Sequence, residues 1–205
     1  VPHGWPWHFL VSDRNGKRAT IEYIRGKLVI HTGPTMPVDV LCNRPYQTEL
    51  DELKRYQGFG GRRRLPPANP KTPRFVRAAR LLRDFDPASE VAPVDYCFGI
   101  LENLSSKLTR RSYVIDLRNR IIYFRTEAVP ETSDVRLEAL DFGSATPVQI
   151  LDLDVRGAGD VTERFEVYTF EANRRIAEGW VRHVQEMFPE AGETERLAGG
   201  YSWTQ

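Results

Sequence analysis

The chain has 205 residues, of which 40% are hydrophobic and 28% are charged, a composition typical of one globular domain spanning residues 1–205. Its 29 basic and 28 acidic residues leave a formal net charge of +1, which argues against a general nucleic-acid binder, because such proteins are usually clearly basic. No run of about 18 apolar residues occurs and no secretory signal is visible, so we expect no membrane-spanning helix.

Two cysteines and four histidines give little sign of metal chemistry. Cys42 and Cys97 lack the spacing of a zinc site or of a disulfide framework. The sequence neither implies nor excludes a single disulfide between them. The histidines form no HxxxH or HExxH pattern. We therefore expect no metal site.

The first residues of the chain predict an antiparallel meander. Residues 7–13, 18–24 and 27–31 have the apolar or alternating pattern of strands. The pairs Asn15-Gly16 and Arg25-Gly26 separate these strands, and such pairs favour tight hairpin turns.

The middle of the chain predicts one more strand and then helices joined by a long loop. Residues 38–42 form an apolar run that indicates a fourth strand. Helical spacing predicts helices over residues 46–56, 74–85 and 94–104, and residues 58–73, rich in Gly, Pro and Arg, predict a loop. The buried face of the second helix is expected to hold Phe75, Ala78, Ala79 and Leu82.

The last third of the chain predicts a hairpin, short strands and a final helix. The hairpin covers residues 112–126, short strand-like pieces follow over residues 134–155, and residues 165–170 indicate a last strand. Residues 171–188 have helical spacing. The order of strands, helices, strands and helix favours a layered α+β fold over alternating βαβ units.

Four motifs stand in order within residues 5–155. Residues 8–31 read HFLVSDRNGKRATIEYIRGKLVIH, and residues 40–61 read VLCNRPYQTELDELKRYQGFGG. Residues 74–79 read RFVRAA, and residues 116–124 read DLRNRIIYF. Together they resemble the choloylglycine hydrolase family, or linear-amide C–N hydrolases, which includes conjugated bile acid hydrolases and penicillin V acylases.

This resemblance implies a four-layer αββα sandwich of the N-terminal-nucleophile hydrolase type. In that family a chain-terminal Cys attacks the amide, and its own α-amino group, with a pKa of about 8, accepts the thiol proton. The resemblance places Asn43 at the oxyanion and Arg74 near the nucleophile. It implies no metal and no organic cofactor, since the nucleophile and its base are one residue. It also implies a homo-oligomer, often a tetramer.

The chain departs from the family pattern at its start. Residue 1 is Val, which offers no nucleophile, and Cys42 stands where the family usually has Thr. We therefore expect this chain to supply the C-terminal part of the fold, and its partner to be an N-terminal nucleophile segment or a separate chain. Alone, the segment is expected to be inactive.

Each candidate residue also has an ordinary structural interpretation. Asn43 would then end a strand in an Asx turn before Pro45. Arg74 would be a helix-start arginine in a salt bridge, and Cys42 fits a small buried residue better than a reactive thiol. Phe59 is predicted to contact the substrate at the lip of a pocket, or else to anchor its own loop.

Other conspicuous residues have mainly structural interpretations. The run Arg62, Arg63 and Arg64 fits a solvated loop, with an anion-binding surface as the alternative. Glu22 is expected to be half-exposed on its strand. The remaining set, expected to be structural, is His8, His31, Trp5, Trp7, Trp180 and Trp203.

The sequence thus predicts hydrolysis of a linear, non-peptide C–N amide bond. Bile salts, penicillin V and N-acyl homoserine lactones all fit this chemistry as small-molecule substrates. The alternative is a non-catalytic scaffold or binding subunit that retains part of the fold. The preference for Arg over Lys suggests a GC-rich genome, and because some family members from such genomes are exported, the resemblance favours a periplasmic over a cytoplasmic location.

Overall fold

The computed structural model describes residues 8–154 and 157–187. Strands and helices occupy separate stretches of this part of the chain, which confirms the predicted α+β class. Trp5, Trp7 and Trp203 lie outside the described residues, and so does the side chain of Trp180, so the expectation for the tryptophans stays a prediction.

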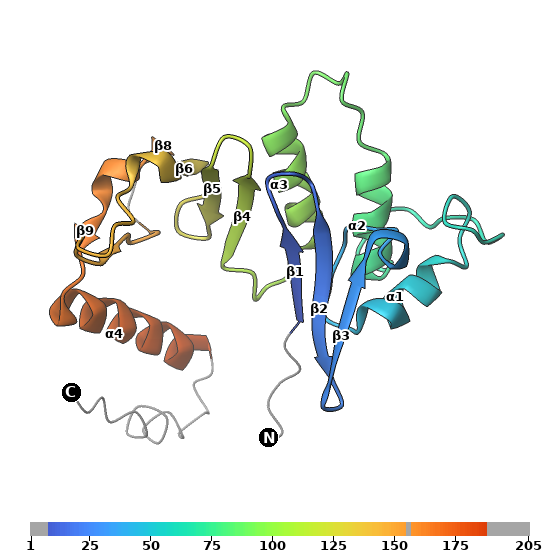
Figure 1. Cartoon of the computed structure of the whole chain (residues 1–205), viewed down its shortest axis with the longest axis horizontal. Coiled ribbons are helices and arrows are strands. Elements are labelled where there is room, and N and C mark those ends of the chain that lie inside the picture. Colours follow the sequence, from blue (N-terminus) through green and yellow to red (C-terminus); the bar gives the residue numbers. More distant parts are fainter. Residues whose placement is uncertain (1–7, 155–156, 188–205) are drawn as a thin grey trace.

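The N-terminal sheet is the meander that the hairpin signals predict (Figure 1). Strands β1 (His8–Ser12), β2 (Arg18–Ile24) and β3 (Lys27–Thr32) pair antiparallel in that order. Arg25 and Gly26, between the second and third strands, have φ values of 50° and 78°. Two consecutive positive φ angles are what a two-residue turn of the primed type requires.

The fourth strand expected over residues 38–42 does not form. These residues follow a 3-10 turn, η1 (Gly33–Thr35), and pair with no described strand. An apolar run becomes a strand only when the backbone of a neighbour satisfies its N–H and C=O groups. Here the hydroxyl of Tyr46 does so locally, since it donates to the Val38 carbonyl at 2.9 Å and accepts from the Val38 N–H at 3.3 Å.

Three helices follow, and Figure 1 shows the first two beside the meander. They are α1 (Tyr46–Leu53), α2 (Arg74–Arg83) and α3 (Pro93–Leu104), all close to their predicted ranges. Helix α1 ends three residues before the predicted residue 56, because backbone groups beyond Leu53 form hydrogen bonds with Arg63 instead of continuing the helix. The Arg63 N–H donates to the Arg55 carbonyl, and the Arg63 carbonyl accepts from the N–H of residue 57.

The buried face of α2 differs from the predicted one. Phe75, Ala78 and Ala79 are buried, as expected, but Leu82 is 42% exposed. Arg77 is buried in its place, because its guanidinium finds acceptors on α3.

The main hydrophobic core lies among α1, α2 and the segment before α1. Its buried members are Met36, Val40, Tyr46, Leu50, Leu53, Phe75, Val76, Ala78 and Ala79. Burying such side chains supplies most of the favourable free energy of folding.

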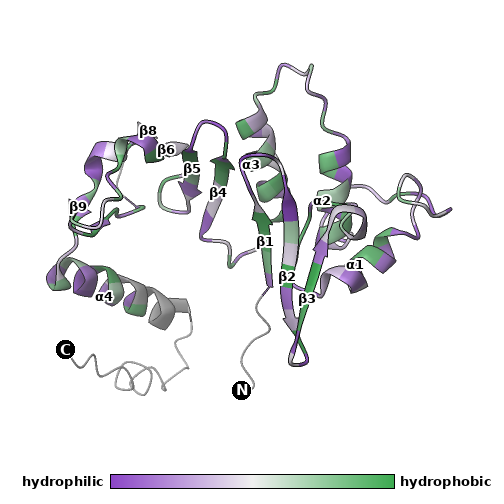
Figure 2. Cartoon of the chain, viewed as in Figure 1, coloured by the Kyte–Doolittle hydropathy of each residue, from purple (hydrophilic) through white to green (hydrophobic). Residues whose placement is uncertain are grey.

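The two faces of the meander differ sharply. Glu22, expected to be half-exposed, is only 1% exposed, and it shares its face with the strand histidines His8 and His31. The other face is apolar yet open to solvent, and Figure 2 shows apolar stretches along these strands. Its exposed members are Phe9, Val11, Tyr23, Leu28 and Ile30.

The C-terminal part holds a second sheet and a last helix. The sheet has the order β4 (Arg111–Asp116), β5 (Ile121–Thr126), β6 (Ser133–Arg136), β8 (Gly159–Asp160). Its first two strands are the hairpin predicted over residues 112–126. A separate pair joins β7 (Gln149–Ile150) to β9 (Glu166–Val167), with the 3-10 turns η2 (Leu137–Ala139) and η3 (Thr162–Arg164) nearby in the chain.

The last predicted strand is shorter than expected, because Phe170 already begins α4 (Phe170–Met187). A second, smaller core under this sheet is built on Phe124, Val135 and Val161. No helix in residues 8–154 and 157–187 has the length and apolar character needed to cross a membrane.

Candidate active site

The two residues predicted to be catalytic line one pocket. An open pocket of about 350 Å³ lies where α1 and α2 begin. Asn43 and Arg74 both line it, although they are far apart in the sequence. The remaining lining residues are Cys42, Arg44, Glu49, Glu52 and Pro73.

Asn43 lies in the turn that leads into α1. It is exposed, and its side chain forms no hydrogen bond with any described residue. The Asx turn considered as its structural role is therefore absent. An amide without a protein partner keeps both of its N–H donors available to a ligand.

Arg74 is the first residue of α2 and follows Pro73, which occupies the N-cap without a side-chain hydrogen bond. Arg74 is exposed and, among the described residues, forms neither a salt bridge nor a hydrogen bond. Arg74 thus begins a helix, as its structural interpretation expected, but the salt bridge of that interpretation is absent among the described residues. Its charge adds to the partial positive charge of the helix N-terminus, so this side of the pocket favours negative groups.

The acidic side of the pocket is organised around Glu49. The Nε of Arg44 donates to Glu49 Oε1 at 3.2 Å, and its Nη2 donates to Glu52 Oε2 at 2.7 Å. Burial raises the pKa of Glu49, and the Arg44 hydrogen bond opposes that shift. The second oxygen of Glu49, Oε2, is buried and has no partner among the described residues.

Sequence reasoning did not single out Glu49, Glu52 or Arg44. A signal for Glu49 was present, because it falls on the same helical face as Tyr46 and Leu53, both fully buried. A carboxyl group on a buried helical face needs a partner, and Arg44 provides it.

Cys42 is partly buried at the edge of the pocket and is a free thiol. Burial, followed by the charge of Glu49, raises its pKa to about 11, although Arg74 and two other arginines oppose the shift. A thiol with so high a pKa is a poor nucleophile at neutral pH, because only the thiolate attacks. Cys97 is also free, so the bridge left open between the two cysteines is absent.

Phe59 does not line this pocket. Its ring is half-buried against the main core, and the guanidinium carbon of Arg83 lies 5.3 Å from the ring centre. The predicted contact between Phe59 and a substrate stays a prediction. The run of Arg62, Arg63 and Arg64 is exposed, as expected of a solvated loop.

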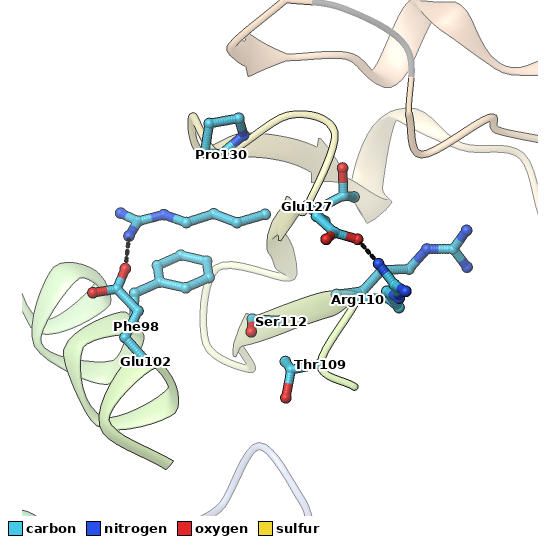
Figure 3. Close-up of a pocket in the computed structure, with 10 residues that line it drawn as sticks. Phe98, Glu102, Thr109, Arg110, Ser112, Glu127 and Pro130 are labelled. Atoms are coloured by element: carbon cyan, nitrogen blue, oxygen red, sulfur yellow. Dashed lines mark hydrogen bonds and ion pairs between the residues drawn. The ribbon is translucent and has the colours of Figure 1, made fainter. Parts of the chain in front are cut away.

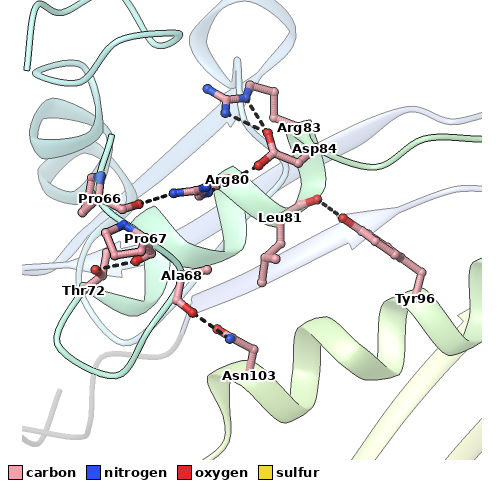
Figure 4. Close-up of polar contacts among 10 residues, drawn as sticks. All are labelled: Pro66, Pro67, Ala68, Thr72, Arg80, Leu81, Arg83, Asp84, Tyr96 and Asn103. Carbon is pink, nitrogen blue, oxygen red and sulfur yellow. Dashed lines mark hydrogen bonds and ion pairs between the residues drawn. The ribbon is translucent and has the colours of Figure 1, made fainter. Parts of the chain in front are cut away.

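The loop that leads to Arg74 is fastened to two helices (Figure 4). Arg80 donates to the Pro66 carbonyl at 2.7 Å, and Asn103 donates from Nδ2 to the Ala68 carbonyl at 3.0 Å. Thr72 donates to the Pro67 carbonyl at 2.8 Å. These bonds fix the entry to α2, and with it the position of Arg74.

A second pocket, of about 220 Å³, lies between α3 and the β4–β5 hairpin (Figure 3). Arg125 lies 4.1 Å above the Phe98 ring and donates to Glu102 at 2.8 Å, while Arg110 pairs with Glu127. Because these arginines already have carboxylate partners, this pocket offers a ligand less unsatisfied charge than the first.

Comparison with known proteins identifies the family. The family model described as linear amide C–N hydrolases, choloylglycine hydrolase family, matches residues 2–150. The chain belongs to this family. The match confirms the resemblance carried by the four sequence motifs.

Individual relatives agree with this membership. The chain is 27% identical over 173 residues to penicillin V acylase of Pectobacterium atrosepticum. This alignment covers 70% of the chain and 46% of that relative. Its structure is similar to that of penicillin V acylase from Agrobacterium tumefaciens, with a TM-score of 0.63, 27% identity, and coverage of 79% of this chain and 56% of the other.

A conjugated bile acid hydrolase from Clostridium perfringens, solved as a variant, has a TM-score of 0.52 at 20% identity and shares the fold. The alignment covers 80% of this chain and 54% of that one. The chain therefore spans about half the length of the relatives that it matches.

Proposed function

We propose that this chain forms the C-terminal part of an amidase that hydrolyses linear N-acyl amides with a cysteine nucleophile. The nucleophile belongs to an N-terminal segment or chain that completes the fold. The sulfur attacks the amide carbonyl carbon while the α-amino group of the same cysteine takes the thiol proton. The C–N bond then breaks, the amine leaves with that proton, and water hydrolyses the thioester.

Asn43 and Arg74 have distinct roles in this proposal. The Asn43 amide donates a hydrogen bond to the oxygen that becomes negative when the carbonyl is attacked. Arg74 stabilises negative charge around the nucleophile by charge-assisted hydrogen bonds. The observation that carries the proposal is that both side chains line one pocket and neither has a partner among the described residues.

The proposal extends to the whole fold. In a four-layer αββα sandwich two sheets pack face to face, and each has helices on its outer face. The exposed apolar face of β1–β3 supports this arrangement, because an open face with Phe9, Leu28 and Ile30 is unusual unless another layer covers it. In our proposal, the other sheet of the sandwich packs on this face of β1–β3. Both sheets belong to one domain, and the complete enzyme is an oligomer.

The test uses the complete gene product that contains residues 1–205. It is incubated with penicillin V, a glycine-conjugated bile salt and an N-acyl homoserine lactone, and amine release is followed. Hydrolysis of at least one compound, together with an N-terminal cysteine found by intact-mass analysis, would support the proposal. A complete protein that binds these compounds without hydrolysing them would favour the scaffold alternative.

The role of Asn43 is tested in the same assay. Asn43→Ala is expected to lower kcat by about 10²–10³-fold, the effect of losing one oxyanion donor. Asn173→Ala on α4, outside the pocket lining, is the matched control and is expected to keep kcat. A loss of less than about tenfold at Asn43 would remove it from the oxyanion role.

A further inference from the structure

Glu22 occupies an unusual place for a carboxyl group. It stands in the middle of β2 and is 1% exposed. Both of its oxygens accept from the backbone N–H of Tyr46, at 3.0 and 3.2 Å. Tyr46 is the first residue of α1, so a strand side chain satisfies a helix N-terminus that comes much later in the sequence.

This bond replaces a missing helix cap. The N-cap residue of α1 is Pro45, which forms no side-chain hydrogen bond to the first turn. Helix N-termini leave N–H groups without partners, and side-chain oxygens normally accept from them. Glu22 supplies that oxygen, and its acidic side chain is also favoured at the positive end of a helix.

Two histidines lie beside the carboxyl group of Glu22 on the sheet. The Nδ1 of His8 lies 3.5 Å from Glu22 Oε1, and the Nε2 of His31 lies 3.8 Å from Oε2. His8 is the direct cross-strand partner of Glu22, and the His31 ring lies 5.0 Å from the Tyr46 ring. The carboxyl group therefore has a histidine neighbour on each adjacent strand, and its hydrogen bonds go to α1.

Tyr46 transmits this constraint to the candidate active site. Its N–H is held by Glu22, and its hydroxyl exchanges two hydrogen bonds with Val38. Both ends of the segment from Val38 to Tyr46 are thus held by hydrogen bonds of one residue, Tyr46. Asn43 lies within that segment, which has no strand ladder to fix it.

We infer that Glu22 is a positioning residue that fixes the turn carrying Asn43 by capping α1 through the Tyr46 N–H. The inference rests on the proposed function for the role of Asn43, but the capping itself is independent of it. Misplacing a catalytic group by about 1 Å lowers the reaction rate by up to about a hundredfold, so a loosened cap affects turnover more than binding.

The first arm of the test is spectroscopic and needs no activity. In the complete gene product, Glu22→Gln and Glu22→Ala are compared by NMR, following the Tyr46 backbone amide and the Asn43 side-chain amide. Both signals are expected to move, less in the Gln variant, because a Gln oxygen still accepts from the Tyr46 N–H. Val135→Ala, in the second core cluster, is the control for general loss of stability, and both signals should stay in place.

The second arm measures turnover of the complete gene product. Glu22→Gln is expected to lower kcat by about tenfold with little change in KM, and Glu22→Ala to lower it further. Equal kcat in wild type and Glu22→Gln, or a loss matched by Val135→Ala, would overturn the inference. If the complete protein hydrolyses none of the compounds, the proposed function fails. Separately, if the Asn43 amide signal does not move in Glu22→Gln, the positioning role of Glu22 is overturned.

Discussion

Arg77 donates from Nη1 to both the backbone carbonyl and the side-chain Oδ1 of Asn103, and so it joins α2 to α3 through one buried guanidinium. Asn103 in turn donates to the Ala68 carbonyl in the loop before α2. One turn earlier on the same helix, Arg74 is exposed and lines the pocket. The two arginines of the RFVR motif therefore differ in their surroundings: Arg77 is buried between two helices and Arg74 lines the pocket.

Alanine at these two positions should have very different effects on stability. Arg77→Ala is expected to lower the free energy of unfolding by about 2–4 kcal/mol, because it leaves buried acceptors unsatisfied and creates a cavity. Arg74→Ala should change it by less than about 0.5 kcal/mol, since its side chain forms no hydrogen bond with any residue that the structure describes. Urea denaturation followed by circular dichroism measures both. Equal losses would contradict this expected difference.

The hydroxyl of Tyr46 stabilises the segment that carries Asn43. Tyr46→Phe keeps the fully buried ring but removes both hydrogen bonds to the Val38 backbone. We expect a loss of about 1–3 kcal/mol in the free energy of unfolding, the cost of leaving partly buried backbone groups unpaired. Tyr113→Phe, at an exposed position on β4, is the matched control and should stay within about 0.5 kcal/mol. A Tyr46→Phe variant as stable as this control would show that water replaces the hydroxyl.

Much of the local structure followed from periodicity. The meander turned at its two glycine pairs, and the helices formed close to their predicted ranges, because tight turns and helices are closed by hydrogen bonds between residues near in sequence. The strand predicted over residues 38–42 failed for the opposite reason. Strand formation requires a partner ladder, and the apolar pattern of one segment carries no information about its partner.

The candidate site was predictable only in part. Asn43 and Arg74 were chosen by resemblance to a family, and no spacing rule brings the starts of two helices together. Glu22 and Glu49 were missed as buried carboxyl groups because their burial comes from tertiary contacts. For both, the usable signal was an acidic residue on an otherwise buried face of its strand or helix.

Gly61 marks a corner where no side chain fits. A Cβ there would lie 2.0 Å from the carbonyl carbon and 2.1 Å from the carbonyl oxygen of Arg55, and backbone atoms cannot move aside. Gly61→Ala is therefore expected to lower the free energy of unfolding by about 1–3 kcal/mol. Gly99→Ala is the matched control, because Gly99 lies in α3 with nothing within 4 Å of its would-be Cβ. That change should stabilise the protein by about 1 kcal/mol, and destabilisation at both positions would argue against the corner geometry.

The thiol of Cys42 reports the balance of charge in the pocket. Its pKa of about 11 predicts that iodoacetamide at pH 8 modifies it about a hundredfold more slowly than in the urea-unfolded chain, as mass spectrometry of the Cys42 peptide measures. The charge of Glu49 raises this pKa, so Glu49→Gln lowers the pKa, increases the thiolate fraction and speeds the reaction. Arg74 lowers the pKa, so Arg74→Gln slows it. Glu138→Gln, outside the pocket lining, should leave the rate unchanged. If Arg74→Gln instead speeds modification, the Arg74 charge does not act on this pocket, and its proposed role beside the nucleophile is lost.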